Sequence, residues 1–100
     1  MLKRTEEISG VWLQGYTSPT TRAELTAVLG EPIQFEAGDK VTIEWGVRLG
    51  GTIATVYDWK RYELGTPADD ELMVYNIGGT DPKAVALIEG LLQLGRKVAV

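Results

Sequence analysis

The sequence predicts an α+β fold: a two-layer sandwich in which an antiparallel sheet of three or four strands carries two helices on one face. Apolar and polar residues alternate over 41–49, and two glycines separate this run from a second strand-like run at 52–59, which indicates a β-hairpin. Segments 21–30 and 80–95 have helix-start and helix-stop residues around apolar stripes, and such stripes are buried by packing on a sheet. The expected order is strand, helix, three strands and helix, in one domain.

The N-terminal part is expected to contain a polar arm and the first strand. Residues 1–7 are mostly polar and predict a mobile arm, whereas 8–16 are rich in β-branched and aromatic residues, as in a strand. Side chains of a regular strand alternate between its two sides. This alternation places Trp12 and Tyr16 on one side of the pleat and Val11 and Leu13 on the other.

The first helix is marked at both ends. Thr21 and Glu24 have the spacing of a capping box, in which each side chain binds a backbone N–H at the helix start. Gly30 and Pro32 end the helix, since glycine suits the position after the last turn and proline prevents continuation. The polar run at 36–40 predicts a turn before the hairpin.

The loop length of the hairpin decides which side chains reach the core. A two-residue Gly-Gly loop, with both glycines at positive φ, pairs Trp45 with Val56 on the core face. Ile53, Tyr57 and Trp59 then lie on the other face. A three-residue loop would move them to the core face, because a slip of one residue exchanges the two faces. We favour the two-residue loop, which leaves a half-apolar second face that needs a cover.

The C-terminal half predicts a loop, a strand and the second helix. Residues 60–71 form a charged loop, and the nearly continuous apolar run at 72–79 is typical of a central strand buried on both faces. Asp81 is expected to cap the helix, Pro82 to occupy its first turn and Gly95 to end it.

The composition excludes several classes of site. One hundred residues, 1–100, suffice for a single domain with its own core, and there is no His and no Cys. Cysteine nucleophiles, histidine bases and thiolate zinc sites are therefore excluded, and no catalytic residue, metal site or cofactor is expected. The net charge of −4 argues against a nucleic-acid partner, whose phosphate backbone is negative as well. No membrane segment or signal peptide is visible, so a cytoplasmic location is expected.

Two stretches are candidate sites. YDWKRY, residues 57–62, includes the second-face aromatics Tyr57 and Trp59, and we expect a protein interface formed by Tyr57, Trp59, Ile53 and Tyr62. NIGGTDP, residues 76–82, joins a strand to a helix start, and its glycines could expose backbone N–H groups to a small ligand. The residues of that possible ligand site are Asn76, Gly78, Gly79 and Thr80.

The segments TRAELTAVLGEP, IEWGV, ATVYDWK and NIGGTDPKAV together resemble small accessory proteins from phages of actinobacteria. The resemblance extends over roughly residues 20 to 92. It implies a phage protein that acts in the cytoplasm of the bacterial host. It implies no reaction and no catalytic residues, since no activity is established for that group.

These observations predict a small non-enzymatic interaction protein that associates with itself, most simply as a homodimer, or binds a bacterial host protein. The alternative is a small-ligand-binding module or minor enzyme that uses the Gly78–Gly79 turn. An apolar pocket beside that turn would favour the alternative.

Overall fold

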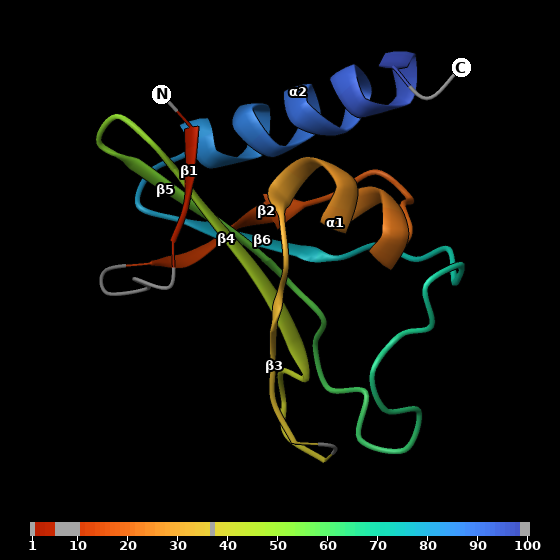
Figure 1. Cartoon of the computed structure of the whole chain (residues 1–100). Coiled ribbons are helices and arrows are strands. Elements are labelled where there is room, and N and C mark those ends of the chain that lie inside the picture. The colour runs from red at the N-terminus through yellow and green to blue at the C-terminus, as the bar shows by residue number, and fades with distance from the viewer. Residues whose placement is uncertain (1, 6–10, 37, 99–100) are drawn as a thin grey trace.

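The computed structural model describes residues 2–5, 11–36 and 38–98 (Figure 1). Within this part of the chain the elements follow the order β1 (Leu2–Arg4), β2 (Trp12–Tyr16), α1 (Arg22–Leu29), β3 (Ile33–Gln34), β4 (Ile43–Leu49), β5 (Thr52–Tyr57), β6 (Asn76–Gly79) and α2 (Lys83–Val98).

The described strands form one antiparallel sheet in the order β1-β4-β5-β6-β2. The short strand β3 also pairs with β4, beside residues 43–44, on the edge that β1 occupies further along. The α+β class and the antiparallel sheet are confirmed. The sheet has six strands rather than three or four, because β1 and β3 are too short to show an alternating pattern.

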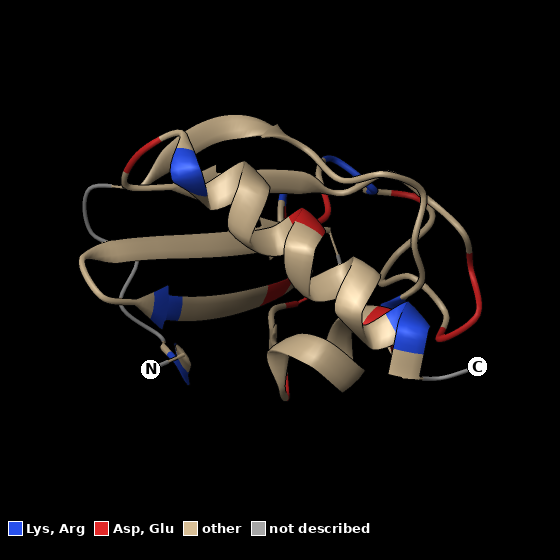
Figure 2. Cartoon of the chain, turned by 90° about the horizontal axis from the view of Figure 1, so that it is seen from above, with Lys and Arg blue, Asp and Glu red and all other residues tan. Residues whose placement is uncertain are grey.

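Both helices pack against the same face of the sheet (Figures 1 and 2). The core joins apolar side chains from both helices to those from one side of the central strands. Its buried members are Leu25, Leu29, Ile43, Trp45, Val47, Ala54, Val56, Tyr75, Ile77, Ala84, Ile88 and Leu92. We call the opposite side of the sheet, which carries Glu44, Thr55, Tyr57 and Asn76, the second face.

The hairpin register is the one predicted for a two-residue loop. Trp45 pairs with Val56 on the helix side, and Glu44 pairs with Tyr57 on the second face. The prediction of positive φ at both glycines was wrong: Gly50 has φ +60°, but Gly51 lies outside the positive region. Only the first central residue of a type II′ turn needs positive φ, so this turn type explains the difference.

Replacing Gly50 by Ala is expected to destabilise the protein by about 1 kcal/mol, because an L-residue at positive φ is strained. Gly51→Ala is the matched control and is expected to change the free energy of unfolding by less than about 0.5 kcal/mol. An added Cβ meets no atom within 4 Å at either position, so the comparison isolates backbone strain. Urea unfolding of both variants measures it; equal losses would mean that the turn is of another type.

The two helices begin as predicted, but the second ends later. Thr21 and Glu24 form the capping box, and Gly30 ends α1 at φ +88°. Asp81 accepts a hydrogen bond from the backbone N–H of Lys83 at 2.7 Å, as a capping residue does. Gly95, expected to end α2, lies inside the helix. A Cβ there would come within 2.4 Å of a Val28 methyl carbon, so this glycine permits the close approach of the two helices.

Two predicted strands are shorter in the structure. The expected strand at 72–79 pairs only over β6, and Leu72 and Val74 are exposed rather than buried on both faces. In this stretch Met73 makes an isolated bridge to Thr20 instead. The expected strand at 52–59 ends at Tyr57, because the next residue turns its side chain into the protein.

The N-terminal segment departs from the prediction in two ways. Leu2–Arg4, expected in a mobile arm, form β1 along the edge of β4; residues 6–10 of the predicted arm and strand lie outside the described residues. A register shift between Leu13 and Gly15 breaks the alternation predicted for the first strand. Leu13 therefore pairs with Gly78, and Tyr16 with Asn76, so both lie on the second face.

Candidate functional site

Most of the exposed aromatic side chains lie on the second face or at its edge; Trp12 pairs with Gly79, a helix-side position, but its side chain lines the cavity from the edge strand β2. They come from segments far apart in the chain: β2, the end of β3, and the end of β5 with the residues after it. We call this set the aromatic face; its members are Trp12, Leu13, Tyr16, Phe35, Tyr57 and Trp59. Tyr57 is half-buried and the other five are exposed.

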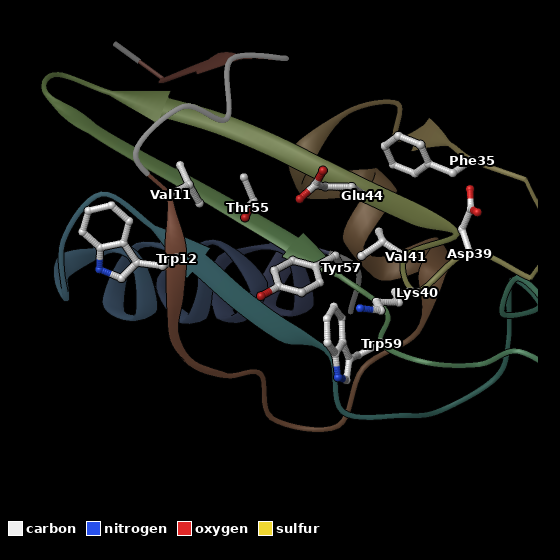
Figure 3. A pocket seen from close by; sticks show the side chains of 10 residues that line it. All are labelled: Val11, Trp12, Phe35, Asp39, Lys40, Val41, Glu44, Thr55, Tyr57 and Trp59. Carbon is white, nitrogen blue, oxygen red and sulfur yellow. The ribbon is translucent and has the colours of Figure 1, made fainter.

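A cavity of about 530 Å³ opens in the aromatic face (Figure 3). Trp12 lies at one end and Phe35 at the other, while Tyr57 and Trp59 form the wall between β5 and the chain that follows it. A second hollow of about 300 Å³ shares Tyr57 and Trp59 and is completed by side chains of β2 and β6. The two rings thus stand between two hollows, which makes them the centre of the face.

Local contacts fix the position of Trp59. Its ring packs edge-to-face on Tyr57, with ring centroids 6.3 Å apart and an interplanar angle of 73°. The Lys60 amine lies 5.7 Å from the centre of the Trp59 ring, within the range of a cation–π contact. The Lys60 backbone has φ +55° and donates its N–H to the carbonyl of Lys40 at 2.7 Å. These contacts orient the indole while 47% of Trp59 remains exposed.

Asp58 anchors this turn from inside the protein. Its carboxylate is fully buried and accepts hydrogen bonds from the backbone N–H of Thr42 at 2.7 Å, from that of Ile43 at 3.1 Å and from the Thr42 hydroxyl. The three donors come from the chain entering β4. Asp58 therefore ties the residues after β5 to the start of β4 and holds its neighbours Tyr57 and Trp59 on the second face.

Glu44 is the acidic group of the cavity. It lies directly across from Tyr57 in the sheet, and burial raises the pKa of its carboxyl above the usual value of 4.5. No hydrogen bond or ion pair joins this carboxylate to another residue of the described part of the chain. The pKa of Tyr57 is also raised, mainly by burial; a hydrogen bond with Asn76 opposes this rise, and the Glu44 charge adds to it.

The raised pKa of Glu44 means that its ionisation costs stability. The folded protein favours the protonated carboxyl. This contribution to stability is fully present below the unfolded pKa and is lost as the pH rises through the folded pKa. Glu44→Gln is therefore expected to melt at a higher temperature than the wild type near pH 7. The difference should shrink as the pH falls below 4.5. Thermal unfolding across this range, with exposed Glu63→Gln as control, measures it; a lower melting temperature at pH 7 would show a stabilising partner for Glu44.

Only two of the four predicted interface residues lie on the aromatic face. Tyr57 and Trp59 lie together at the centre of the aromatic face. Ile53 is only 5% exposed, so its side chain is not open to a partner as expected. Tyr62 is exposed but lies in the loop at 60–71 and contributes to neither hollow of the aromatic face.

The predicted ligand site does not form an open turn. Gly78 and Gly79 are buried inside β6, and a Cβ at Gly79 would come within 2.3 Å of the Ala84 Cβ. The Thr80 hydroxyl accepts a hydrogen bond from the backbone N–H of Ile53 at 3.1 Å. Asn76 alone of the four lines a hollow, the one beside Tyr57. These glycines are therefore needed for close packing of the sheet and α2.

Phe35 and Glu44 are the members of the site that the sequence did not reveal. Phe35 follows β3, and its backbone N–H donates to the carbonyl of Thr42 at 2.8 Å, which brings it beside the cavity. A two-residue strand leaves no periodic signal. For Glu44, its place across from Tyr57 was available from the hairpin register.

Other classes of site find little support. Among the described residues, no group of three or more Asp or Glu side chains could hold a metal ion, and no helix has the length and apolar character needed to cross a membrane. In the view onto the helices, basic and acidic residues are interspersed (Figure 2). Such mixing differs from the basic face that a nucleic-acid backbone requires.

Comparison of the chain with protein-family models, with curated proteins and with solved structures finds no match.

Proposed function

We propose that this chain is a small non-enzymatic interaction protein that binds a protein partner through its aromatic face. The observation that carries the proposal is the gathering of five exposed apolar side chains and Tyr57 around two adjoining hollows on one side of the sheet. Contiguous exposed apolar surface is uncommon on soluble monomers and marks contact sites, and Trp and Tyr are frequent anchors in them. Held rings such as Trp59 lose little conformational entropy on binding.

The resemblance to actinobacterial phage proteins suggests where the partner is found. We propose that the protein acts in the cytoplasm of a bacterial host and that the partner is a host protein. The similar segments include ATVYDWK, which carries Tyr57 and Trp59, and IEWGV, which carries Glu44. The proposal therefore places the segments of the resemblance at the centre of the contact surface.

A homodimer is the second candidate, and one feature favours it. Trp59 projects beside the larger cavity, so a twofold axis near this residue would insert the indole of each copy into the cavity of the other. Such an isologous contact uses the same surface on both copies. Sedimentation of the wild type and of Trp59→Ala tests it: a dimer that the substitution converts to a folded monomer supports this candidate, and a strictly monomeric wild type removes it.

Capture of partners from host lysate by tagged variants tests the principal proposal. Trp59→Ala removes an anchor from the aromatic face, whereas Leu94→Ala removes a comparably exposed side chain from α2. Trp59→Ala is expected to weaken capture of a discrete partner at least tenfold, the effect of an anchor contributing about 1.4 kcal/mol or more. Leu94→Ala should capture as well as the wild type. Equal capture by all three proteins, or loss only in Leu94→Ala, would contradict the proposal.

A further inference from the structure

The larger cavity is lined mainly by apolar side chains but contains the carboxylate of Glu44, and the inference about the group that enters it rests on the proposed function. Glu44 points into the cavity between Phe35 and Tyr57 (Figure 3). Its carboxylate is half-buried and makes no hydrogen bond or ion pair with the described residues. A carboxylate removed from water without a partner is energetically costly, so a ligand that brings hydrogen-bond donors would be favoured there.

A second polar group of the cavity also lacks a partner. Thr55 lies on the neighbouring strand, is fully buried and lines the same cavity. Its hydroxyl oxygen has no hydrogen-bond partner in the part of the chain that the structure describes. Buried hydroxyl groups are nearly always hydrogen-bonded in native proteins. The Glu44 carboxylate is the group that a ligand can reach, because the Thr55 hydroxyl is fully buried and lies toward β6, where a Cβ at Gly78 would come within 2.6 Å of it.

The charge of the cavity favours a cation. Among the described residues that line it, Asp39 and Glu44 supply two carboxylates and Lys40 one amine, which leaves one negative charge in excess within this set. Lys40 is exposed at the rim, and within the described residues it forms no ion pair with Glu44. The electron-rich faces of Tyr57 and Trp59 attract cations as well. Carboxylate and aromatic walls together are complementary to a flat, positively charged group.

We propose that the cavity receives the guanidinium group of an arginine side chain on the partner protein. A guanidinium can donate two parallel hydrogen bonds to the Glu44 carboxylate while it stacks on an aromatic ring. A lysine amine offers no planar surface for that stacking, and arginine is enriched in protein interfaces.

A second copy of this chain is a poor source of that arginine. Four of its five arginines bind acidic side chains or backbone carbonyls of their own chain, and Arg48 also has interactions within the chain. Among the contacts of these four are those of Arg4 with the Glu31 carbonyl, Arg22 with Asp69, Arg61 with Glu71 and Arg96 with Glu24. A homodimer would have to break one of these contacts, whereas another protein can present a free arginine.

The test uses a blocked amino acid as probe and the intact chain as receptor. N-acetylarginine amide is titrated into isotope-labelled protein, and the resonances of Trp59, Tyr57 and Glu44 are followed by NMR. N-acetylcitrulline amide is the control, because it has nearly the same shape without the charge. We expect the arginine probe to shift these resonances at millimolar concentrations and the citrulline probe to leave them in place. Glu44→Gln should bind the arginine probe about tenfold more weakly, the loss of one charge-assisted hydrogen bond.

Several results would overturn the inference. These are equal shifts from both probes, shifts that Glu44→Gln leaves unchanged, no shift at these residues, or shifts that appear with protein concentration alone, as self-association would produce.

If partner capture depends on Trp59 while the probe fails, only this inference falls. If the arginine probe binds but Trp59→Ala leaves capture unchanged, the proposed function falls, and the cavity would be a site for free guanidinium compounds instead of a partner side chain.

Discussion

Trp45→Ala is expected to lower the free energy of unfolding by about 3–5 kcal/mol, the cost of deleting a large aromatic side chain from a core. Trp45 is 1% exposed, packs edge-to-face on Tyr75 at 5.6 Å between ring centroids, and donates its indole N–H to the Thr26 hydroxyl at 3.2 Å. The substitution leaves a void between the sheet and α1. Chemical denaturation followed by circular dichroism measures the loss.

Trp59→Ala is the matched comparison for Trp45→Ala. Trp45 lies in β4 and Trp59 two residues after the end of β5, where 47% of it is exposed on the aromatic face. Its removal is expected to cost about 1 kcal/mol at most, as for a surface substitution that loses one ring contact. A loss as large as that of Trp45→Ala would show that Trp59 belongs to the monomer core, which would leave the aromatic face without its central anchor.

Asp58→Ala is expected to destabilise the protein by about 3–5 kcal/mol, because two backbone N–H groups and one hydroxyl would lose their buried acceptor. These donors are the N–H groups of Thr42 and Ile43 and the Thr42 hydroxyl. Asp58→Asn keeps one carbonyl oxygen as an acceptor and is expected to cost about half as much. Urea unfolding of the two variants gives both values.

Asp70→Asn serves as the control for Asp58→Asn, because Asp70 lies exposed in the loop at 60–71. It should leave the free energy of unfolding within about 0.5 kcal/mol of the wild type. If Asp58→Ala were equally harmless, the hydrogen bonds between Asp58 and the start of β4 would not be what holds Tyr57 and Trp59 on the second face. Retained NMR shifts of the Trp59 indole in Asp58→Ala would lead to the same conclusion.

The sequence allowed the central hairpin to be predicted because its determinants are local. Two glycines and an alternating run suffice to pair Trp45 with Val56, and that register alone assigns Tyr57 to the second face. The capping box at Thr21 is likewise a pattern of four residues. Such elements depend on neighbouring residues, so their outcome differs from the prediction only in details such as the φ angle of Gly51.

The strand order and the cavity depend on pairing between distant segments and could not be predicted. β1 and β3 are stable only because β4 offers an edge to both, and two or three residues carry no periodic signal. The bulge at Gln14 moves Tyr16 to the second face, although alternation predicts the opposite side for it. Phe35 reaches the cavity only through the pairing of β3. The aromatic face was thus predicted at its centre and missed at its ends; its role as an interface stays a prediction.

The measurement that tests the aromatic face most directly is site-specific photo-cross-linking in host cells. A benzoylphenylalanine replaces Tyr16, which is 58% exposed on the aromatic face, or Leu94, which is 59% exposed on α2, so exposure is matched. We predict a discrete covalent adduct from position 16 that disappears when Trp59→Ala is added, and none from position 94. An adduct from position 94 but not 16, equal adducts from both, or none from either would contradict the account.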